Sequence, residues 1–179
     1  VTIVANDSES DDRSLYDTYL AAFTKARSRL WITHAYFAPN LELLDALTAA
    51  AERGVDVRLI VPGFSDSQIV LDATRSTYTT LLEKGVKIYQ LEGAFLHAKT
   101  VVIDTAVSIV GSANLDMRSF VHNDEVNAIV FSRTFGQRME KVFERDQVTA
   151  QPLELSQWRQ RSTWQKLKEA VAKLFGYWL

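Results

Sequence analysis

The chain has 179 residues, 47% of them hydrophobic and 23% charged, a composition typical of one folded domain large enough to bury a core. Its formal net charge of −2 provides no overall cationic field for nucleic acid or anionic lipid, so any phosphate site must be local. The absence of cysteine excludes disulfides and thiolate metal sites. No apolar run approaches the roughly 18 residues of a membrane span, and because the chain begins at Val1 we expect a piece of a longer protein.

Strand and helix patterns alternate through the first half of the chain. Apolar runs typical of strands occur at 1–5, 30–33, 55–61 and 86–91. Between them, apolar residues recur at helical spacing. The first helix is predicted from Leu15 to Ala26, the second begins after a capping Asn40 and ends at Gly54, and the third stops near Gly85. This repeated strand–helix order predicts an α/β sheet with right-handed crossovers.

After residue 91 the pattern changes to strands. Three β-rich runs occupy 99–103, 107–110 and 126–131, and the first two are too close for a helix between them, so we expect a hairpin. Ser132 can cap a closing helix, whose apolar face would include Phe135, Met139, Val142 and Phe143. We therefore expect residues 1–150 to form one α/β domain.

Residues 151–179 are predicted to form an amphipathic tail. Pro152 breaks the preceding helix, and apolar residues then recur at steps of mostly three and four, at Trp158, Trp164, Leu167, Val171, Leu174 and Trp178. From Ser156 to Leu179 there are five basic residues and one acidic residue, a net charge of +4. The tail could lie on a membrane surface, or its stripe could pack on this domain or on a missing part of the protein.

The residues that point to chemistry lie between 96 and 120. His97 and Lys99 are two residues apart, and alternate residues of a strand face the same side, so an imidazole and an ammonium would project together. One strand later, Gly111 lets the backbone approach a ligand closely, and Ser112 and Asn114 offer neutral hydrogen-bond donors. Together these groups could surround a phosphate without a metal ion.

Such a set suits attack on a phosphodiester, because an anionic substrate favours a neutral nucleophile and a site that supplies positive charge. A neutral imidazole nitrogen qualifies, and its other nitrogen needs a partner to fix the tautomer. Glu125 and Asp124 are available at the start of the last strand.

Each of these features also has a purely structural interpretation. A lone His-x-Lys pair arises by chance, Gly-Ser-Ala-Asn is an ordinary turn, and Asp104 with Thr105 could simply shape the hairpin. His34 and His122 fit surface or structural positions better than catalytic ones, and three scattered histidines do not suggest a zinc cluster. Only the spacing of the whole set favours function.

That spacing is His97-x-Lys99-x4-Asp104 followed by Gly111-Ser112-x-Asn114. It resembles the His-Lys-Asp motif of the phospholipase D superfamily at every defining position. The resemblance implies a mixed β-sheet sandwiched between helices, one half of a pseudo-two-fold pair.

The resemblance also implies roles for individual residues. His97 would form a covalent phosphohistidine or act as the acid and base opposite it, Glu125 would orient His97, and Asp104 would be mainly structural. The implied catalytic residues are His97, Lys99, Asp104 and Glu125. The implied phosphate-binding residues are His97, Lys99, Ser112 and Asn114. No metal and no cofactor is implied.

Finer features resemble the C-terminal catalytic half of a bacterial cardiolipin synthase, over nearly the whole chain. They are the segments 32–39 (ITHAYFAP), 53–58 (RGVDVR), 65–67 (SDS), 114–120 (NLDMRSF) and 158–167 (WRQRSTWQKL). One departure is Ala35, where the family's ITxPYFxP segment usually has proline. A second is that cardiolipin synthases carry two His-Lys-Asp motifs and this chain carries one.

The resemblance implies that two phosphatidylglycerol molecules give cardiolipin and glycerol. The expected partners are phosphatidylglycerol, a membrane surface, and a second motif from a missing N-terminal half or from a homodimer mate. The parent protein is expected at the bacterial plasma membrane, and this piece as soluble or peripheral. Two alternatives stay open: a homodimeric phosphodiesterase acting on lipid or nucleic acid, although the charge argues against nucleic acid, and an inactive half-domain fragment.

Overall fold

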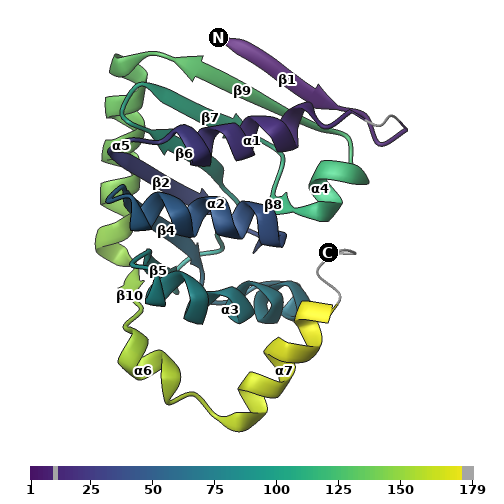
Figure 1. Ribbon diagram of the computed structural model, residues 1–179, viewed down its shortest axis with the longest axis vertical. Coiled ribbons are helices and arrows are strands. Elements are labelled where there is room, and N and C mark those ends of the chain that lie inside the picture. Colours follow the sequence, from purple (N-terminus) through teal and green to yellow (C-terminus); the bar gives the residue numbers. More distant parts are fainter. Residues whose placement is uncertain (10–11, 175–179) are drawn as a thin grey trace.

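An eight-stranded mixed sheet forms the centre of the protein in the computed structural model, which describes residues 1–9 and 12–174 (Figure 1). The strand order is β1-β9-β7-β6-β2-β4-β5-β10, with parallel pairing only for β2–β4 and β4–β5. The strands are β1 (Thr2–Asn6), β2 (Arg29–His34), β4 (Asp56–Pro62), β5 (Lys87–Leu91), β6 (Lys99–Ile103), β7 (Val107–Gly111), β9 (Glu125–Phe131) and β10 (Gln151–Pro152). Two short strands, β3 (Phe37–Ala38) and β8 (Leu115–Asp116), pair separately in parallel.

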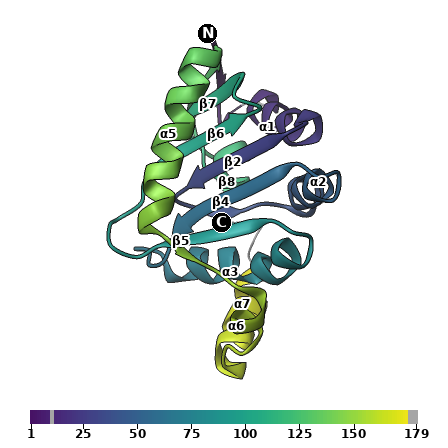
Figure 2. The same cartoon turned by 90° about the vertical axis from the view of Figure 1, so that its left-hand side faces the viewer.

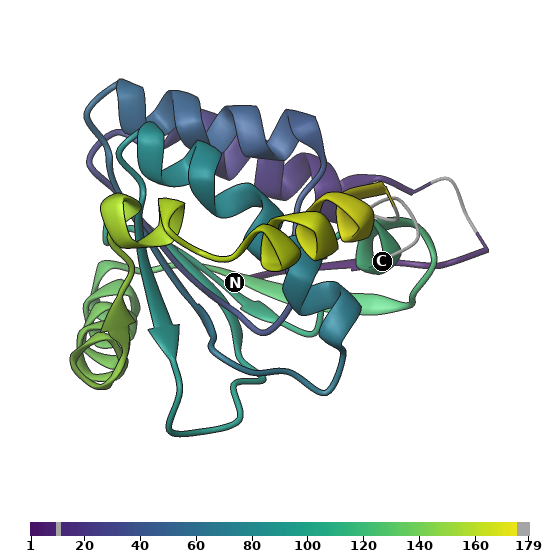
Figure 3. The same ribbon diagram turned by 90° about the horizontal axis from the view of Figure 1, so that it is seen from below.

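Helices cover both faces of the sheet (Figures 2 and 3). One face carries α1 (Ser14–Lys25), α2 (Leu41–Glu52) and α3 (Gln68–Glu83), and the other carries α5 (Arg133–Thr149). The main apolar core lies under α1–α3, whereas a smaller cluster of Trp31, Ile60 and Phe143 packs under α5. The predicted mixed sheet sandwiched between helices is therefore confirmed.

Local signals in the sequence account for several element boundaries. The Asn40 side chain caps α2 by accepting a hydrogen bond from the Leu43 amide at 3.0 Å, and Ser132 caps α5 through the Phe135 amide at 3.3 Å. Gly85 ends the turn after α3 with a φ of +87°, a conformation that side chains disfavour. These predicted helix boundaries are confirmed.

Some predictions about the sheet and its helices are wrong in detail. β1 does not join the parallel strands, but crosses to the far edge and pairs antiparallel with β9. Gln151–Pro152 is not a simple break, because it forms an edge strand against β5. Val142 is 40% exposed, since the narrow contact of α5 with the sheet buries Phe143 and leaves its neighbour outside.

The tail forms two helices rather than one. α6 (Leu155–Arg159) and α7 (Thr163–Leu174) lie against α3 (Figure 1). Trp158 leaves the predicted stripe, because it is buried with its ring centroid 5.1 Å from that of Tyr78. Trp178, which the sequence placed in the same stripe, lies outside the described residues.

Candidate functional site

Lys99 is the first residue of β6, and its ammonium lies against His97. The Nζ atom donates to the His97 carbonyl oxygen at 2.9 Å and lies 3.2 Å from Nδ1 and 3.5 Å from Nε2 of the ring. His97 precedes the strand and is exposed, so the two side chains meet although only Lys99 lies on the predicted strand. Lys99 itself is 6% exposed. Burial lowers the pKa of Lys99, and the nearby carboxylates of Glu125 and Asp116 oppose that shift.

His34 lies beside Lys99 on the neighbouring strand, where the two residues are paired across β2 and β6. His34 is fully buried, and its ring packs edge-on against Tyr19 with centroids 6.0 Å apart. Neither ring nitrogen has a hydrogen-bond partner among the described residues. Burial, with a smaller contribution from the Lys99 charge, lowers the pKa of His34 to about 3, so this imidazole is neutral. The sequence left a surface position and a structural position open for His34, and the structure shows a buried, structural position.

Ser112 and Asn114 follow β7, near the start of β9. The Ser112 hydroxyl accepts a hydrogen bond from the Val126 amide at 3.0 Å, so it continues the pairing of β7 with β9. The Asn114 side chain makes no hydrogen bond with any described residue, and its Oδ1 is buried. Because an unpartnered buried amide is costly, Asn114 is the better candidate of the two for a contact with a bound ligand.

Gly111 is required by a close approach to Asn127 of β9, which no local pattern in the sequence indicates. A Cβ at this position would lie 1.9 Å from Oδ1 of Asn127, which no side chain could tolerate. The Asn127 amide uses that space to donate to the Tyr19 hydroxyl at 3.0 Å and to accept from the Ala113 amide at 3.3 Å. Asn127 therefore positions the Gly-Ser-Ala-Asn turn on the sheet.

Glu125, the first residue of β9, is 9% exposed. Its carboxylate accepts a hydrogen bond from Nδ2 of Asn123 at 3.3 Å, and in the described part of the chain it makes none to His97. Its charge acts on Lys99. The role of Glu125 in orienting His97 therefore stays a prediction.

Asn6 and Asp116 also support this region, and no local pattern in the sequence indicates either residue. The Asn6 side chain donates to three carbonyl oxygens in or just after α4 (Met117–Val121), those of Ser119, Phe120 and Asn123, and accepts from the Glu125 amide at 3.2 Å. Asp116 caps α4 through the Ser119 amide at 2.7 Å. Burial raises the pKa of Asp116 to about 6, and the hydrogen bonds from Ser119 only partly oppose it.

Asp104 lies at the opposite end of β6 from Lys99. It occupies the hairpin turn with a φ of +52°, and Thr105 follows at +59°. Its carboxylate accepts hydrogen bonds from the backbone amides of Arg27, Ser28 and Arg29. Burial raises the pKa of Asp104, but these hydrogen bonds outweigh it and the net shift is downward. This geometry is that of an anchor and does not bring Asp104 to His97.

An aromatic pair borders His97 on the solvent side. The Phe95 ring stacks on the His97 ring at a centroid distance of 6.1 Å and an interplanar angle of 12°. Phe64, from the loop after β4, lies 6.4 Å from Phe95. Both phenylalanines are about half exposed, at 46% for Phe64 and 54% for Phe95. The exposed imidazole thus contacts both an apolar rim, formed by Phe64 and Phe95, and the Lys99 ammonium.

Two other kinds of functional feature are missing from the part of the chain that the structure describes. No three His, Asp or Glu side chains gather there as metal ligands would. None of the described helices is both long and apolar enough to cross a bilayer.

Among the relatives in sequence are cardiolipin synthases. The family model for the cardiolipin synthase phospholipase D-like domain matches residues 19–147. Cardiolipin synthase of Geobacillus thermodenitrificans is 37% identical over 176 residues, which are 98% of this chain and 35% of that protein. Cardiolipin synthase A of Yersinia pseudotuberculosis is also 37% identical over 176 residues, 98% of this chain and 36% of that protein. The chain therefore spans about a third of the length of these relatives.

Solved structures share the fold at low sequence identity. Nuc, a phospholipase D family member from Salmonella typhimurium, matches with a TM-score of 0.72 at 16% identity, over 86% of this chain and 98% of that one. Phosphatidylserine synthase of Haemophilus influenzae matches with a TM-score of 0.75 at 16% identity, over 99% of this chain and 47% of that one. The family model and the sequence relatives decide the assignment: the chain belongs to the cardiolipin synthase family of phospholipase D-like domains.

Proposed function

We propose that this chain supplies one half of an active site that transfers a phosphatidyl group between two phosphatidylglycerol molecules, giving cardiolipin and glycerol. The observation that supports it most directly is the buried Lys99 ammonium held 3.2 Å from Nδ1 of the exposed His97 ring. The same ammonium lies 3.5 Å from Nε2, so it is close to both nitrogens of the ring. An anionic phosphodiester would satisfy the poorly solvated Lys99 charge and replace the imidazole as its partner.

The chemistry needs two proton-transfer roles. A ring nitrogen of one imidazole attacks phosphorus, the bond from phosphorus to the glycerol oxygen breaks, and the leaving alkoxide takes a proton from a second imidazole. That second imidazole then removes the proton from the hydroxyl of the incoming phosphatidylglycerol. The hydroxyl oxygen attacks phosphorus, the phosphorus–nitrogen bond breaks, and cardiolipin is released.

His97 cannot fill both roles, because it is covalently occupied in the intermediate if it is the nucleophile. His34 is buried beside Lys99 rather than exposed, and His122 caps the end of α4. The second imidazole must therefore come from another segment of a longer protein or from a second copy of this chain. A homodimeric phosphodiesterase remains the competing function, because this chain holds a single His-x-Lys pair.

The test compares this chain with its full-length parent on phosphatidylglycerol vesicles, with cardiolipin and glycerol both measured by mass spectrometry. We expect equal amounts of the two products from the parent, and a fall of several orders of magnitude for His97→Ala in the parent. A parallel incubation with single-stranded DNA tests the competing function. Activity of His97→Ala within about tenfold of the unchanged parent would contradict the assignment.

A further inference from the structure

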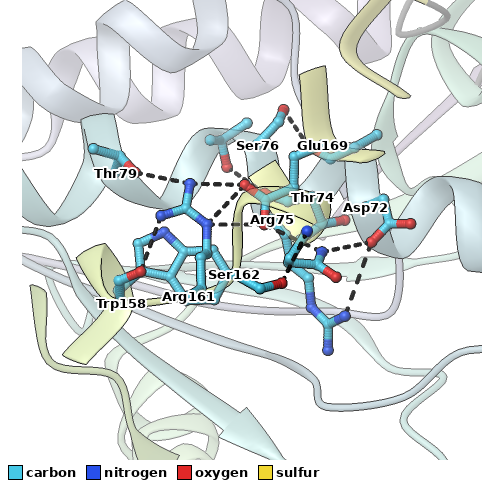
Figure 4. A network of polar contacts seen from close by, with 12 residues as sticks. Asp72, Thr74, Arg75, Ser76, Thr79, Trp158, Arg161, Ser162 and Glu169 are labelled. Carbon is cyan, nitrogen blue, oxygen red and sulfur yellow. Dashed lines mark hydrogen bonds and ion pairs between the residues drawn. The ribbon is translucent and has the colours of Figure 1, made fainter. Parts of the chain in front are cut away.

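α7 is fixed to α3 by a buried polar network (Figure 4). The Arg161 guanidinium donates to both carboxylate oxygens of Glu169, at 3.0 Å from Nε and 2.8 Å from Nη2. Glu169 is 3% exposed, and Gln165 links it to Asp72 of α3, with bonds of 3.2 Å and 2.8 Å. Ala172, on the same face of α7, packs against the α3 side and is 3% exposed.

This network sets the rotation of α7 about its own axis. Rolling the helix would separate Glu169 from Arg161 and leave a carboxylate buried without its partner, which is strongly unfavourable. The two-pronged guanidinium–carboxylate geometry adds directionality to the contact. The face of α7 that carries Gln165, Glu169 and Ala172 is therefore held inward, and the face opposite is held outward.

The outward face is apolar. Its four large side chains are Trp164, Leu167, Val171 and Leu174, with exposed fractions of 66%, 53%, 48% and 80%. Their spacing of three, four and three residues places them on one side of the helix. A groove between α7 and the first turn of α3 continues the patch to Ile69, which is 43% exposed. These five side chains are called the α7 stripe below.

Basic side chains border the α7 stripe. At about 100° per residue, Lys168 lies next to one edge of the stripe, whereas Lys166 and Lys173 lie about a quarter turn beyond the other edge. Lys173 also lines a pocket with residues of α2 and α3. Lys166 and Lys173 form no ion pair with any described residue, whereas Lys168 is 4.0 Å from Asp72. From Ser156 to Leu174 the charges are five basic and one acidic, so this region is +4 in a chain whose net charge is −2.

A short segment of chain connects the α7 stripe to the aromatic rim beside His97. Phe64, on the aromatic rim beside His97, precedes Ile69 of the stripe by five residues. Five residues span at most about 18 Å even when fully extended. The apolar rim of the site and the α7 stripe are therefore joined by a short segment of chain.

We propose that the α7 stripe is a docking surface for the interface of an anionic lipid bilayer. An exposed apolar stripe bordered by lysines, with a tryptophan at its start, has the composition of helices that lie in the headgroup region. Four side chains on one helix are also few for a stable protein interface, which buries about 800 Å² on each partner. The choice of phosphatidylglycerol as the anionic lipid rests on the proposed function, but the argument for a bilayer rests on the stripe and its lysines.

The test is vesicle flotation of this chain in a His97→Asn background, so that catalysis cannot contribute to binding. Vesicles are made of phosphatidylcholine with or without phosphatidylglycerol. The test variant is Leu167→Ser with Val171→Ser. The matched control is Val142→Ser with Val148→Ser on α5, whose valines are 40% and 86% exposed on the other side of the sheet.

We expect binding to the anionic vesicles, little binding to pure phosphatidylcholine, and a partition coefficient reduced by about tenfold or more in the test variant only. The emission of Trp164, assigned by comparison with Trp164→Phe, should shift to the blue when anionic vesicles are added. Circular dichroism and thermal unfolding of both double variants check that they remain folded.

Three results would overturn the proposal. They are no flotation of the protein whose α7 stripe is unmutated, equal flotation of the test and control variants, and no blue shift of the Trp164 emission. A fall in solution mass on mutating the α7 stripe, without vesicle binding by the starting protein, would identify it as a contact between copies instead. These outcomes are independent of cardiolipin production by the parent, so the docking surface and the proposed reaction can fail separately.

Discussion

His34 and Lys99 are paired across β2 and β6, and the imidazole lies fully buried beside the ammonium with neither ring nitrogen hydrogen-bonded to a described residue. Burial disfavours the charged form of the His34 ring, and the adjacent Lys99 ammonium repels that form. Both effects therefore lower the pKa of His34. Protonation of His34 in the core is therefore coupled to the charge of Lys99 in the site.

The first prediction concerns His34→Thr and the pH dependence of stability. The pKa of His34 is about 3 in the folded chain and about 6.5 when unfolded. Between these values the unfolded chain binds more protons, so the protein loses stability as the pH falls below about 6.5. His34→Thr removes that loss. As the pH falls below about 6.5, the free energy of unfolding of the variant, relative to that of the unmutated protein, should rise by up to about 1.4 kcal/mol per pH unit.

Urea unfolding of both proteins between about pH 7 and pH 5 measures this difference. Asp116 acts in the opposite direction, because its folded pKa of about 6 exceeds the usual value for an aspartate. Its contribution is present at low pH and is lost as the pH rises through about 6. Since both proteins contain Asp116, it cancels in the comparison, and parallel stability curves would contradict the prediction.

The second prediction is that Lys99→Met separates stability from activity. The substitution removes a buried ammonium whose desolvation is unfavourable, so the free energy of unfolding should stay equal or rise by about 1 kcal/mol. Phosphatidyl transfer by the parent should fall by about a hundredfold or more, since the site loses its positive charge. Lys87→Met, at an exposed lysine of β5, is the matched control and should keep full activity. Comparable losses of stability and activity would argue that Lys99 is structural only.

The third prediction concerns Glu125 and a bound phosphate analogue. When vanadate occupies the site, we expect the Lys99 ammonium to turn from the His97 ring toward the anion. The ring is then free to donate a hydrogen bond to Glu125, at a distance below about 3.2 Å. A crystal structure of the full-length parent with vanadate measures this distance directly. If Glu125 instead keeps its contact with Asn123, its part in catalysis is confined to its charge near Lys99.

The fourth prediction is that Asp104→Ala destabilises the fold and spares the chemistry. The substitution leaves three backbone amides without their acceptor and places alanine at a positive φ, so we expect a loss of about 2–4 kcal/mol. Asp104→Asn keeps one acceptor oxygen and tolerates that φ, and should lose less. Turnover per folded molecule, measured with denaturation curves at the assay temperature, should change by less than about tenfold in both. A fall of more than about tenfold in turnover per folded molecule would make Asp104 part of the reaction.

The fifth prediction concerns the isolated chain. Because it carries one His-x-Lys pair, its specific activity should be zero at all concentrations or rise with concentration as two copies bring their His97 residues together. Activity and solution mass are measured on the same dilution series. Substantial activity from a strictly monomeric chain would refute the requirement for a second motif.

Much of the fold follows from local signals in the sequence. The caps at Asn40 and Ser132, the glycine after α3 and the hairpin at Asp104 each depend on residues within a few positions of one another. The His97–Lys99 contact is equally local, which explains why the spacing alone could suggest it.

The features that could not be predicted depend on contacts between distant segments. β1 pairs with β9, more than a hundred residues away, and nothing in residues 1–5 indicates that partner. The burial of His34 depends on Tyr19 and Lys99 arriving from two other elements. Trp158 fits the periodicity of the tail stripe, but Tyr78 of α3 offers it a buried position.

β6 is five residues long, and its two ends do different things: Lys99 at the start faces His97, while Asp104 directly after the end holds the backbone of residues 27–29. The four residues between Lys99 and Asp104 therefore fix both the distance from Lys99 to the anchored end and the face of the sheet on which Lys99 lies. One residue inserted there would keep the anchored end in place and turn Lys99 to the α5 side of the sheet, because successive side chains of a strand alternate between faces. The motif is thus a measured length of strand, and an indel within it would be more damaging than most substitutions at its apolar positions.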